Sequence, residues 1–503
     1  MRNTNDFRTA LLRTGMGCFV FAAGATFLNI CLLPFAREYY GYRVPMMFAG
    51  FALALAAYAL LGRILARTQT DRLERIRRIA VPVFLAALFV IQVLLGCLMQ
   101  YVPAGDNHAV YEGSRILASD GNFDAFPNYE LYLARYPNQW GILLFFTGMW
   151  KLFGLFGLES IFMPQVIVQA LLYIPGMFSA LSIARRTRGV RAELMLLALL
   201  AGCLPLYLAA GVVYTDTFSM PFVPIVLDLA LRVMHEKDAK RQLLLVVACG
   251  LTATLGGMIK MTVVIALMAA VIVWLMTMHR VRALLCGVLC GAILLAGNAA
   301  VHHALLGDTI DRQIHEQQNT PKVHWIMMSI PSSDNPNGGY ANEYGLTWSL
   351  MDEGASREEI MDSIYSRMKD KIYTLRYPNR LVLATLRKNA AAFGDGSFGM
   401  TEMLDDNPVR ENAVSRIVLS GRQYYTRYLG VTSGIFFAQL LFALISCIRD
   451  LRRRETDMAV GYVAAFGMML FLMLWEARSR YFFGFVPVIL LLASRIAGEK
   501  EKL

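Results

Sequence analysis

The sequence predicts an all-α polytopic membrane protein, with about twelve transmembrane helices, juxtamembrane helices and a large extracytoplasmic loop. Of the 503 residues, 56% are hydrophobic and only 17% are charged, whereas about a quarter of the residues in a soluble domain are charged. Several apolar stretches reach the roughly 20 residues that cross a bilayer. The basic residues, which give a net charge of +11, gather in short loops between these stretches and follow the positive-inside pattern. We therefore expect a multi-pass protein of the cell membrane, with membrane lipids and not nucleic acid around it.

The charges of the loops set the order and direction of the first spans. The N-terminus, with Arg2, Arg8 and Arg13, is expected in the cytoplasm, and so is the loop 67–78 with its cluster of arginines. Two spans must therefore precede this loop, and a third span after it must end on the outer side. We expect these three spans at about residues 17–35, 45–65 and 79–99.

The first outer loop, residues 101–159, contains an apolar stretch whose position is decided by charge. Residues 140–156 are apolar, but the stretch is short and has Lys151 in its middle. If it crossed the membrane, the basic loop 184–191 would lie on the outer side, against the positive-inside pattern. We therefore expect 140–156 to lie along the outer interface as a juxtamembrane helix, with a second such helix at 107–118.

Beyond this loop, basic and neutral loops alternate regularly. By this count the polar segment from residue 302 to 430 is extracytoplasmic, with an amphipathic helix at about 357–373 and a helix start at 376–380. It is expected to cover the site and select the acceptor. His324–Trp325 and Asn337–Tyr340 could form part of an acceptor site, and ordinary loop packing explains them equally well. Nine further spans are expected at about 160–183, 194–210, 215–233, 243–255, 262–278, 284–301, 431–448, 458–475 and 481–496.

Two carboxylates lie at the outer ends of predicted spans, where ionisable groups are costly and tend to serve a function. Asp106 follows the third span, and Asp216 opens the span at 215–233. Each could be only a helix N-cap. The two could instead share a cavity and act as general base and electrostatic partner, or hold a divalent cation through their oxygens. We expect no zinc site and no disulfide, because all eight cysteines lie in apolar segments.

Cations lie at the same level of the membrane. Lys260 separates two apolar runs, and it could snorkel to the surface or contact a phosphate. Arg478 and Arg480, close to Glu476, are predicted on the outer side, where they could anchor the interface or grip a phosphate with a bidentate fork. A carboxylate with several cations beside it indicates an amphiphilic substrate with a phosphate head group and a long apolar tail. A polyprenyl-phosphate sugar fits this description.

Several short stretches of the first outer loop form one pattern. It consists of an acidic residue at the start, a small helix with a Gly turn, a Tyr-Pro step, and a juxtamembrane helix that ends in Phe-Gly. These stretches are residues 105–113, 117–121, 135–138 and 150–154, followed later by 214–217, 257–260 and 476–481. The set resembles the GT-C glycosyltransferases, in particular the branch of protein O-mannosyltransferases and aminoarabinose transferases.

The resemblance implies a GT-C-like fold and an inverting glycosyltransferase, fed by a polyprenyl-phosphate sugar at the extracytoplasmic face. By position, Asp106 would be the catalytic base that activates the acceptor hydroxyl, and Lys260 with the last arginines would contact the lipid phosphate. The family often has a Glu where this chain has Asn107, so a second carboxylate comes from elsewhere or is not needed. The candidate substrate-binding residues are Asn107, His108, Tyr136, Asp216, Lys260, Glu476, Arg478 and Arg480.

The resemblance begins near residue 79. It leaves the sugar unspecified, and it leaves the acceptor open between a glycan, a lipid and a protein. It divides the chain into four parts. These are residues 1–78, two additional helices; 79–301, the transmembrane core with the first outer loop; 302–430, the extracytoplasmic segment; and 431–503, the C-terminal transmembrane helices.

An alternative function is a transporter or flippase of a lipid-linked sugar. It would need polar residues through the middle of the membrane, but most predicted spans are free of charge.

Overall fold

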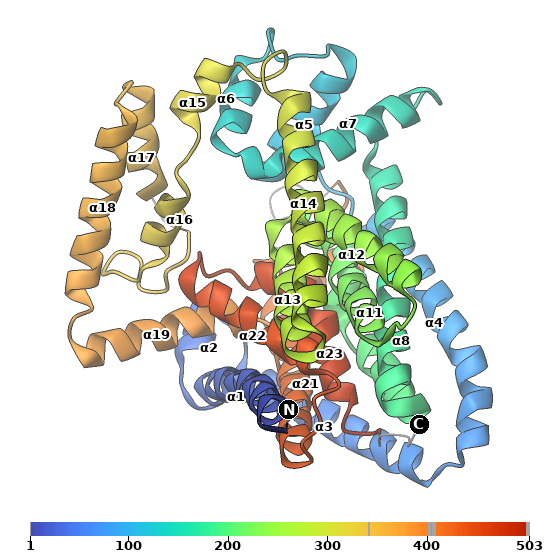
Figure 1. Ribbon diagram of the computed structural model, residues 1–503. Coiled ribbons are helices and arrows are strands. Elements are labelled where there is room, and N and C mark those ends of the chain that lie inside the picture. Colours follow the sequence, from blue (N-terminus) through green and yellow to red (C-terminus); the bar gives the residue numbers. More distant parts are fainter. Residues whose placement is uncertain (1, 341–342, 401–403, 405–408, 499–503) are drawn as a thin grey trace.

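The computed structural model describes residues 2–340, 343–400, 404 and 409–498. Within these residues the chain is built from helices, and Leu306 and Ile310 form an isolated β-bridge. The predicted class, an all-α polytopic membrane protein, is confirmed. Figure 1 shows a bundle of long helices with shorter helices gathered at one end and along one side.

Eight helical elements of the described chain are long and apolar enough to cross a membrane, and three shorter apolar helices accompany them. The long ones are α1 (Arg2–Leu32), α3 (Val44–Arg67), α4 (Thr70–Leu98), α8 (Phe162–Ala201), α10 with α11 (Thr215–Ser219 and Phe222–His235), α12 (Ala239–Ile259), α14 (Arg280–Leu305) and α21 (Tyr425–Arg452). The shorter ones are α13 (Val264–Thr277), α22 (Ala459–Leu474), and η5 with α23 (Ser479–Phe485 and Val486–Ser494).

The basic loop predicted at 184–191 is helical instead, with a break at Gly189. Its φ of 76° and ψ of −174° interrupt α8, a conformation that glycine adopts without a steric penalty because it has no Cβ. The break divides α8 into two arms, which correspond to the spans predicted at 160–183 and 194–210. The second arm ends earlier than predicted and is followed by the short helices α9 (Leu204–Leu208) and η2 (Ala209–Gly211).

The two N-terminal helices are packed into the bundle. Met16 and Phe19 of α1 are fully buried in the main hydrophobic core. Helix α3 lies against α21 so closely that a side chain in place of Gly434 would overlap the backbone at Met47. Small residues allow this kind of close approach between membrane helices. The short helix α2 (Phe35–Tyr40) connects α1 to α3.

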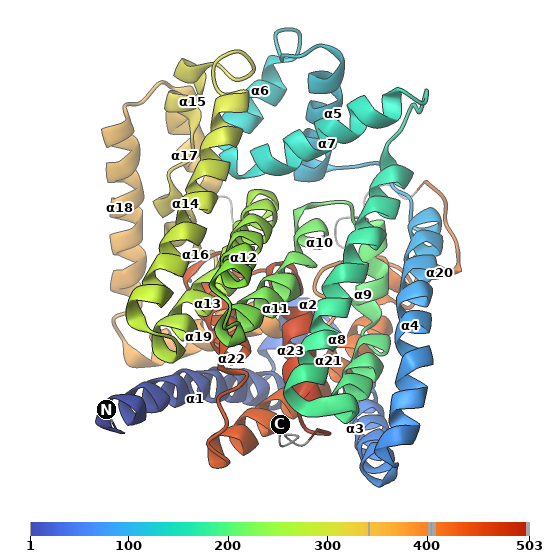
Figure 2. The same cartoon turned by 45° about the vertical axis from the view of Figure 1, so that its right-hand side comes forward.

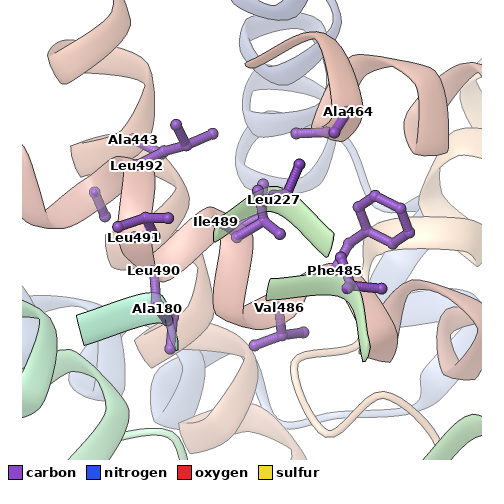
Figure 3. Close-up of a cluster of buried hydrophobic side chains, with 14 of the residues drawn as sticks. Ala180, Leu227, Ala443, Ala464, Phe485, Val486, Ile489, Leu490, Leu491 and Leu492 are labelled. Atoms are coloured by element: carbon purple, nitrogen blue, oxygen red, sulfur yellow. The ribbon is translucent and has the colours of Figure 1, made fainter. Parts of the chain in front are cut away.

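Helix α23 forms the centre of the bundle. All nine of its residues are buried, as expected for a helix that is apolar on every side. Figure 3 shows its side chains among Ala180 of α8, Leu227 of α11, Ala443 of α21 and Ala464 of α22. The residues that precede α23 are therefore attached to the most deeply buried helix of the molecule.

The polar segments form helices at one end of the bundle, which we call the site end. The first outer loop folds into α5 (Gly105–Ser119), α6 (Pro127–Arg135), η1 (Pro137–Gln139) and α7 (Trp140–Gly154). Figure 2 shows α7 lying across this end at a steep angle to α4, as predicted for a juxtamembrane helix. The N-terminus and the turn between α21 and α22 lie at the opposite end.

The long polar segment runs alongside the bundle from the site end. The helices predicted near 357–373 and 376–380 are confirmed as α18 and α19, and a capping box between Ser356 and Glu359 begins α18. The helices of this segment are α15 (Arg312–Gln318), α16 (Lys322–Ser329), α17 (Glu343–Asp352), α18 (Arg357–Thr374), α19 (Pro378–Phe393) and α20 (Ala413–Val418).

Candidate active site

Asp106 lies in the first turn of α5 and is exposed to solvent. It does not cap the helix, because the N-cap is Ala104. Its Oδ1 accepts a hydrogen bond of 2.8 Å from the hydroxyl of Tyr132, and Asp106 lies at the positive end of the α5 dipole. The carboxylate is therefore held in place and still accessible.

Three tyrosines of α6 and its end face the start of α5. Tyr129, Tyr132 and Tyr136 are spaced by three and four residues, which places them on one side of a helix. The Tyr129 hydroxyl lies 3.1 Å from Nε2 of His108, and the Tyr132 and Tyr136 rings are 4.8 Å apart. Burial raises the pKa of Tyr136, and the negative charge of Asp106 raises it further.

Asn107 points in the other direction. Its side chain is fully buried and donates a hydrogen bond to the hydroxyl of Tyr101. The structure thus separates the three consecutive candidates, since Asp106 and His108 contact α6 while Asn107 packs inside the protein.

Asp216 is buried and paired with cations. It lies in the first turn of α10, whose N-cap is Tyr214, so Asp216 is not a cap either. Lys260 forms an ion pair with Asp216, and Nε of Arg480 lies 4.0 Å from its Oδ2. The Lys260 and Arg480 side chains keep 15% and 17% of their surface exposed. Lys260 is positioned by the break in the helix between α12 and η3 (Met261–Val263).

Glu476 brings Arg478 into the same group. The buried Glu476 carboxylate accepts hydrogen bonds from Nε of Arg478 at 3.3 Å and from the hydroxyl of Tyr481 at 2.9 Å. The Tyr481 ring also lies 4.2 Å from Nζ of Lys260. Tyr481 therefore joins the Glu476 pair to the Asp216 pair.

Two tyrosines lie within electrostatic range of both Asp106 and these charges. Burial raises the pKa of Tyr214, Asp106 raises it further, and Arg480 lowers it. Burial also raises the pKa of Tyr340, and the charges of Asp106 and Glu476 add to the effect. Asp106 and the cations thus lie around the same residues, although they come from three separate parts of the chain.

No pattern in the sequence pointed to Asp395. Its carboxylate holds the short segment that carries Arg478 and Arg480. Asp395 is 1% exposed and accepts hydrogen bonds from the backbone of Ser397 and Gly399, both at 2.7 Å. It also accepts a bond of 3.0 Å from the hydroxyl of Ser479, which lies between Arg478 and Arg480. The only local signal is the compact Asp-Gly-Ser-Phe-Gly sequence, which is typical of a tight turn.

Arg135 is a second residue that sequence reasoning missed. It is 8% exposed, forms an ion pair with Asp352 of α17, and its Nε donates a hydrogen bond of 3.0 Å to Gln318. Its guanidinium lies 4.7 Å from the ring centroid of Trp348. Arg135 thereby attaches the first outer loop to the long polar segment.

The residues present do not fit the divalent cation considered for Asp106 and Asp216. Asp216 is already neutralised by Lys260 and Arg480, and a carboxylate with two cationic neighbours is a poor ligand for a further cation. Within the described part of the chain, no three His, Cys, Asp or Glu side chains are grouped as metal ligands would be.

Residues 26–500 match the family of conserved hypothetical integral membrane proteins. The chain belongs to this family. The match begins near the end of α1 and includes α3. None of the curated proteins matches the chain.

Two solved structures are similar to the chain in part. One is the archaeal oligosaccharyltransferase AglB from Archaeoglobus fulgidus, in complex with an inhibitory peptide and a dolichol-phosphate, with 12% identity, a TM-score of 0.40, and coverage of 82% of this chain and 50% of that chain. The other is ArnT from Cupriavidus metallidurans bound to undecaprenyl phosphate, with 15% identity, a TM-score of 0.35, and coverage of 83% and 77%. The chain spans half the length of the oligosaccharyltransferase.

Proposed function

We propose that this membrane protein is an inverting glycosyltransferase, which moves a sugar from a polyprenyl-phosphate donor to an acceptor at the extracytoplasmic face. The observation that carries the proposal is an accessible carboxylate, Asp106, whose charge acts on Tyr214 together with Arg480 and on Tyr340 together with Glu476. Asp216 and Glu476 in turn pair with the cations Lys260, Arg480 and Arg478. The resemblance of the outer-loop motifs to GT-C glycosyltransferases points to the same chemistry.

In the proposed reaction, Asp106 accepts the proton of the acceptor hydroxyl while that oxygen attacks the anomeric carbon. The bond between the anomeric carbon and the phosphate oxygen breaks, and the lipid phosphate leaves with the electron pair. Attack opposite to the leaving group inverts the anomeric configuration. The hydrogen bond from Tyr132 occupies Oδ1 of Asp106 and orients the carboxylate for this role.

The cations receive the charge that develops on the leaving phosphate. Lys260, Arg478 and Arg480 carry three positive charges, and the carboxylates of Asp216 and Glu476 balance two of them. The group therefore has one positive charge in excess before a phosphate binds. Arginine can grip a phosphate with two parallel hydrogen bonds, so Arg478 and Arg480 supply direction as well as charge.

The extracytoplasmic location is supported by the distribution of arginines. The arginine-rich stretch 67–78 was predicted as a loop, but it is the end of α3 and the first turns of α4. It lies at the opposite end of the bundle from α5 to α7 (Figure 2). Loops rich in Lys and Arg stay in the cytoplasm. The site end then faces outwards, where lipid-linked sugars are the available donors.

The test is the substitution Asp106→Asn, with Asp120→Asn at the exposed far end of α5 as the matched control. We expect Asp106→Asn to lose roughly a hundredfold to ten-thousandfold in transfer rate and Asp120→Asn to keep it. Product formed from a labelled polyprenyl-phosphate sugar is measured by mass spectrometry in reconstituted membranes. Unchanged turnover by Asp106→Asn would contradict the assignment, and movement of labelled lipid without a new glycosidic bond would favour a flippase.

A further inference from the structure

A series of aromatic side chains connects the first outer loop to the long polar segment. We call Tyr136, Trp325, Tyr340, Tyr344 and Trp348 the aromatic wall. The Tyr136 ring lies 6.0 Å from Trp325 and 5.7 Å from Trp348. Trp348 lies 4.9 Å from Tyr344, and Tyr344 stacks on Tyr340 at 4.8 Å. Each ring thus contacts the next, although they belong to three separate segments.

The aromatic wall begins at the proposed catalytic carboxylate. Tyr136 contacts Tyr132, which donates its hydroxyl hydrogen to Asp106. At the other side, Tyr340 lies 6.0 Å from the guanidinium of Arg478. Trp325 stacks at 6.5 Å on Trp475, which directly precedes Glu476. The wall therefore extends from the base to the cations, and both of its ends reach groups of the site.

The exposure of the wall differs from that of the structural aromatic residues. Trp140 and Trp274 are fully buried, whereas Trp325, Tyr344 and Trp348 are only partly buried and Tyr340 is 45% exposed. Tyr136 is buried at 9% exposure, so it is the other four rings that keep aromatic surface open to solvent next to the site, where a purely structural cluster would bury it.

Charged groups border the aromatic surface. The Arg135 guanidinium lies over Trp348, and its partner Asp352 keeps 53% of its side chain exposed. A sugar ring has an apolar face of C–H groups and a rim of hydroxyls. Aromatic faces bordered by an arginine and a carboxylate match both features, whereas an acyl chain offers no hydroxyl groups to these charged side chains.

We propose that the aromatic wall is the acceptor subsite and that the acceptor is a saccharide, whose terminal sugar stacks on the wall with a hydroxyl directed towards Asp106. This inference rests on the proposed glycosyltransferase function and goes beyond it by naming the class of acceptor. It assigns the long polar segment to acceptor recognition, and leaves donor binding to the cations.

The first experiment measures binding without turnover. The full-length protein in lipid nanodiscs is titrated with neutral hexasaccharides of glucose, mannose, galactose, arabinose and N-acetylglucosamine, and intrinsic tryptophan fluorescence is recorded. We expect at least one of them to bind. Tyr340→Ala should weaken that binding by roughly twofold to tenfold, as for the loss of one aromatic contact. Tyr340→Phe keeps the ring and should bind like the wild type.

The control is Tyr377→Ala, because Tyr377 belongs to the same segment and is also 45% exposed but lies outside the wall. The pair Trp348→Ala and Trp348→Phe repeats, at a second position, the comparison between a variant that loses the aromatic ring and one that keeps a ring. In transfer assays we expect Tyr340→Ala to raise the acceptor KM and leave the donor KM unchanged.

The outcomes separate this inference from the proposed function. If no hexasaccharide binds, or if Tyr377→Ala weakens binding as much as Tyr340→Ala, the acceptor subsite is wrong whatever the activity. Transfer to a lipid or peptide in the absence of saccharide binding would overturn the subsite and preserve the transferase. Saccharide binding that depends on Tyr340, without transfer from any lipid-linked sugar, would preserve the subsite and overturn the transferase.

Discussion

Two clusters of buried charge lie at opposite ends of the helical bundle, and they differ in access. At the end away from the site, Arg188 and Arg495 share the carboxylate of Asp450, each at 2.7 Å. The side chains of these three residues are 0% to 1% exposed. Tyr462 donates a further hydrogen bond of 3.0 Å to Asp450. This inner cluster ties α8, α21, α22 and α23 together, and its three central side chains are closed to solvent. At its rim, Glu455 and Asp457 pair with Arg188 and Arg495 and keep 16% and 18% of their side chains exposed.

The cluster at the site end has similar residue types but reaches the surface. Its cations keep 15%, 17% and 34% of their side chains exposed in Lys260, Arg480 and Arg478, and Asp106 beside them is exposed. The comparison teaches that buried charge alone does not mark a functional site. A structural role leaves the pairs sealed, whereas a binding role requires that a ligand can reach them.

The largest expected difference between the two clusters is in stability. Asp450→Asn would remove the charge that Arg188 and Arg495 share inside the bundle. Glu455 and Asp457 still pair with these arginines, so we expect a cost of about 3 kcal/mol, at the low end for a broken buried pair. The matched substitution Asp216→Asn should cost less, because Lys260 and Arg480 can turn to solvent. Thermal unfolding of the purified variants measures both. Equal losses of stability would show that the two clusters do not differ in the way proposed here.

A smaller effect is expected from the support of the site-end cluster. Ser479→Ala removes the hydrogen bond to Asp395, and a bond to a charged group contributes about 1.5–3 kcal/mol. We expect weaker donor binding, seen as a raised donor KM, because Ser479 holds the chain between the two arginines. Ser446→Ala is the control, since this buried serine donates to a neutral carbonyl at 3.4 Å in the closed part of the bundle. If both variants change the donor KM equally, the support by Asp395 is not specific.

The smallest expected effect concerns acid. His324 is fully buried below the aromatic wall, where its Nδ1 lies 2.9 Å from the Thr347 hydroxyl, and burial lowers its pKa from 6.5 to about 4. The unfolded chain takes up a proton near pH 6.5 and the folded chain only near pH 4, so stability falls as the pH drops through this range. We expect a loss of about 1 kcal/mol between pH 7.5 and 5.5. The inner cluster contains no histidine and should not contribute.

This acid dependence is measured by thermal unfolding of the wild type and of His324→Gln, which cannot titrate. The slope should become smaller in His324→Gln and stay unchanged in the control His303→Gln, which changes an exposed histidine. Burial also lowers the pKa of His315, which together with His302 supplies the slope that remains. A slope that stays the same in His324→Gln would assign the acid sensitivity to other groups.

The sequence predicted the features that depend on local pattern and on loop charge. The helices at Gly105–Ser119 and Arg357–Thr374 follow from amphipathic periodicity, and α7 was placed by the arginine count. It did not predict the burial of Arg188, which was expected in an exposed cytoplasmic loop. Arg188 can be buried because it pairs with the carboxylate of Asp450. Asp450 comes 262 residues later in the chain, so no local pattern reveals the pair.

The same limit applies to the site. The sequence indicated Asp106, Asp216 and Lys260 because each is an ionisable residue at the end of an apolar span. It could not tell that Asn107 points inward, or that Asp395 and Ser479 meet across 84 residues. Their hydrogen bonds depend on the packing of distant helices, which leaves no trace in the local residue pattern.

The central position of α23 has a consequence for how such a protein can diversify. The segment that carries Glu476, Arg478 and Arg480 continues directly into this helix, so its geometry is inherited from the most constrained part of the molecule. The aromatic wall belongs instead to peripheral segments that lie outside this central helix. A change in these segments can therefore alter what the exposed side binds and leave the anchored half in place.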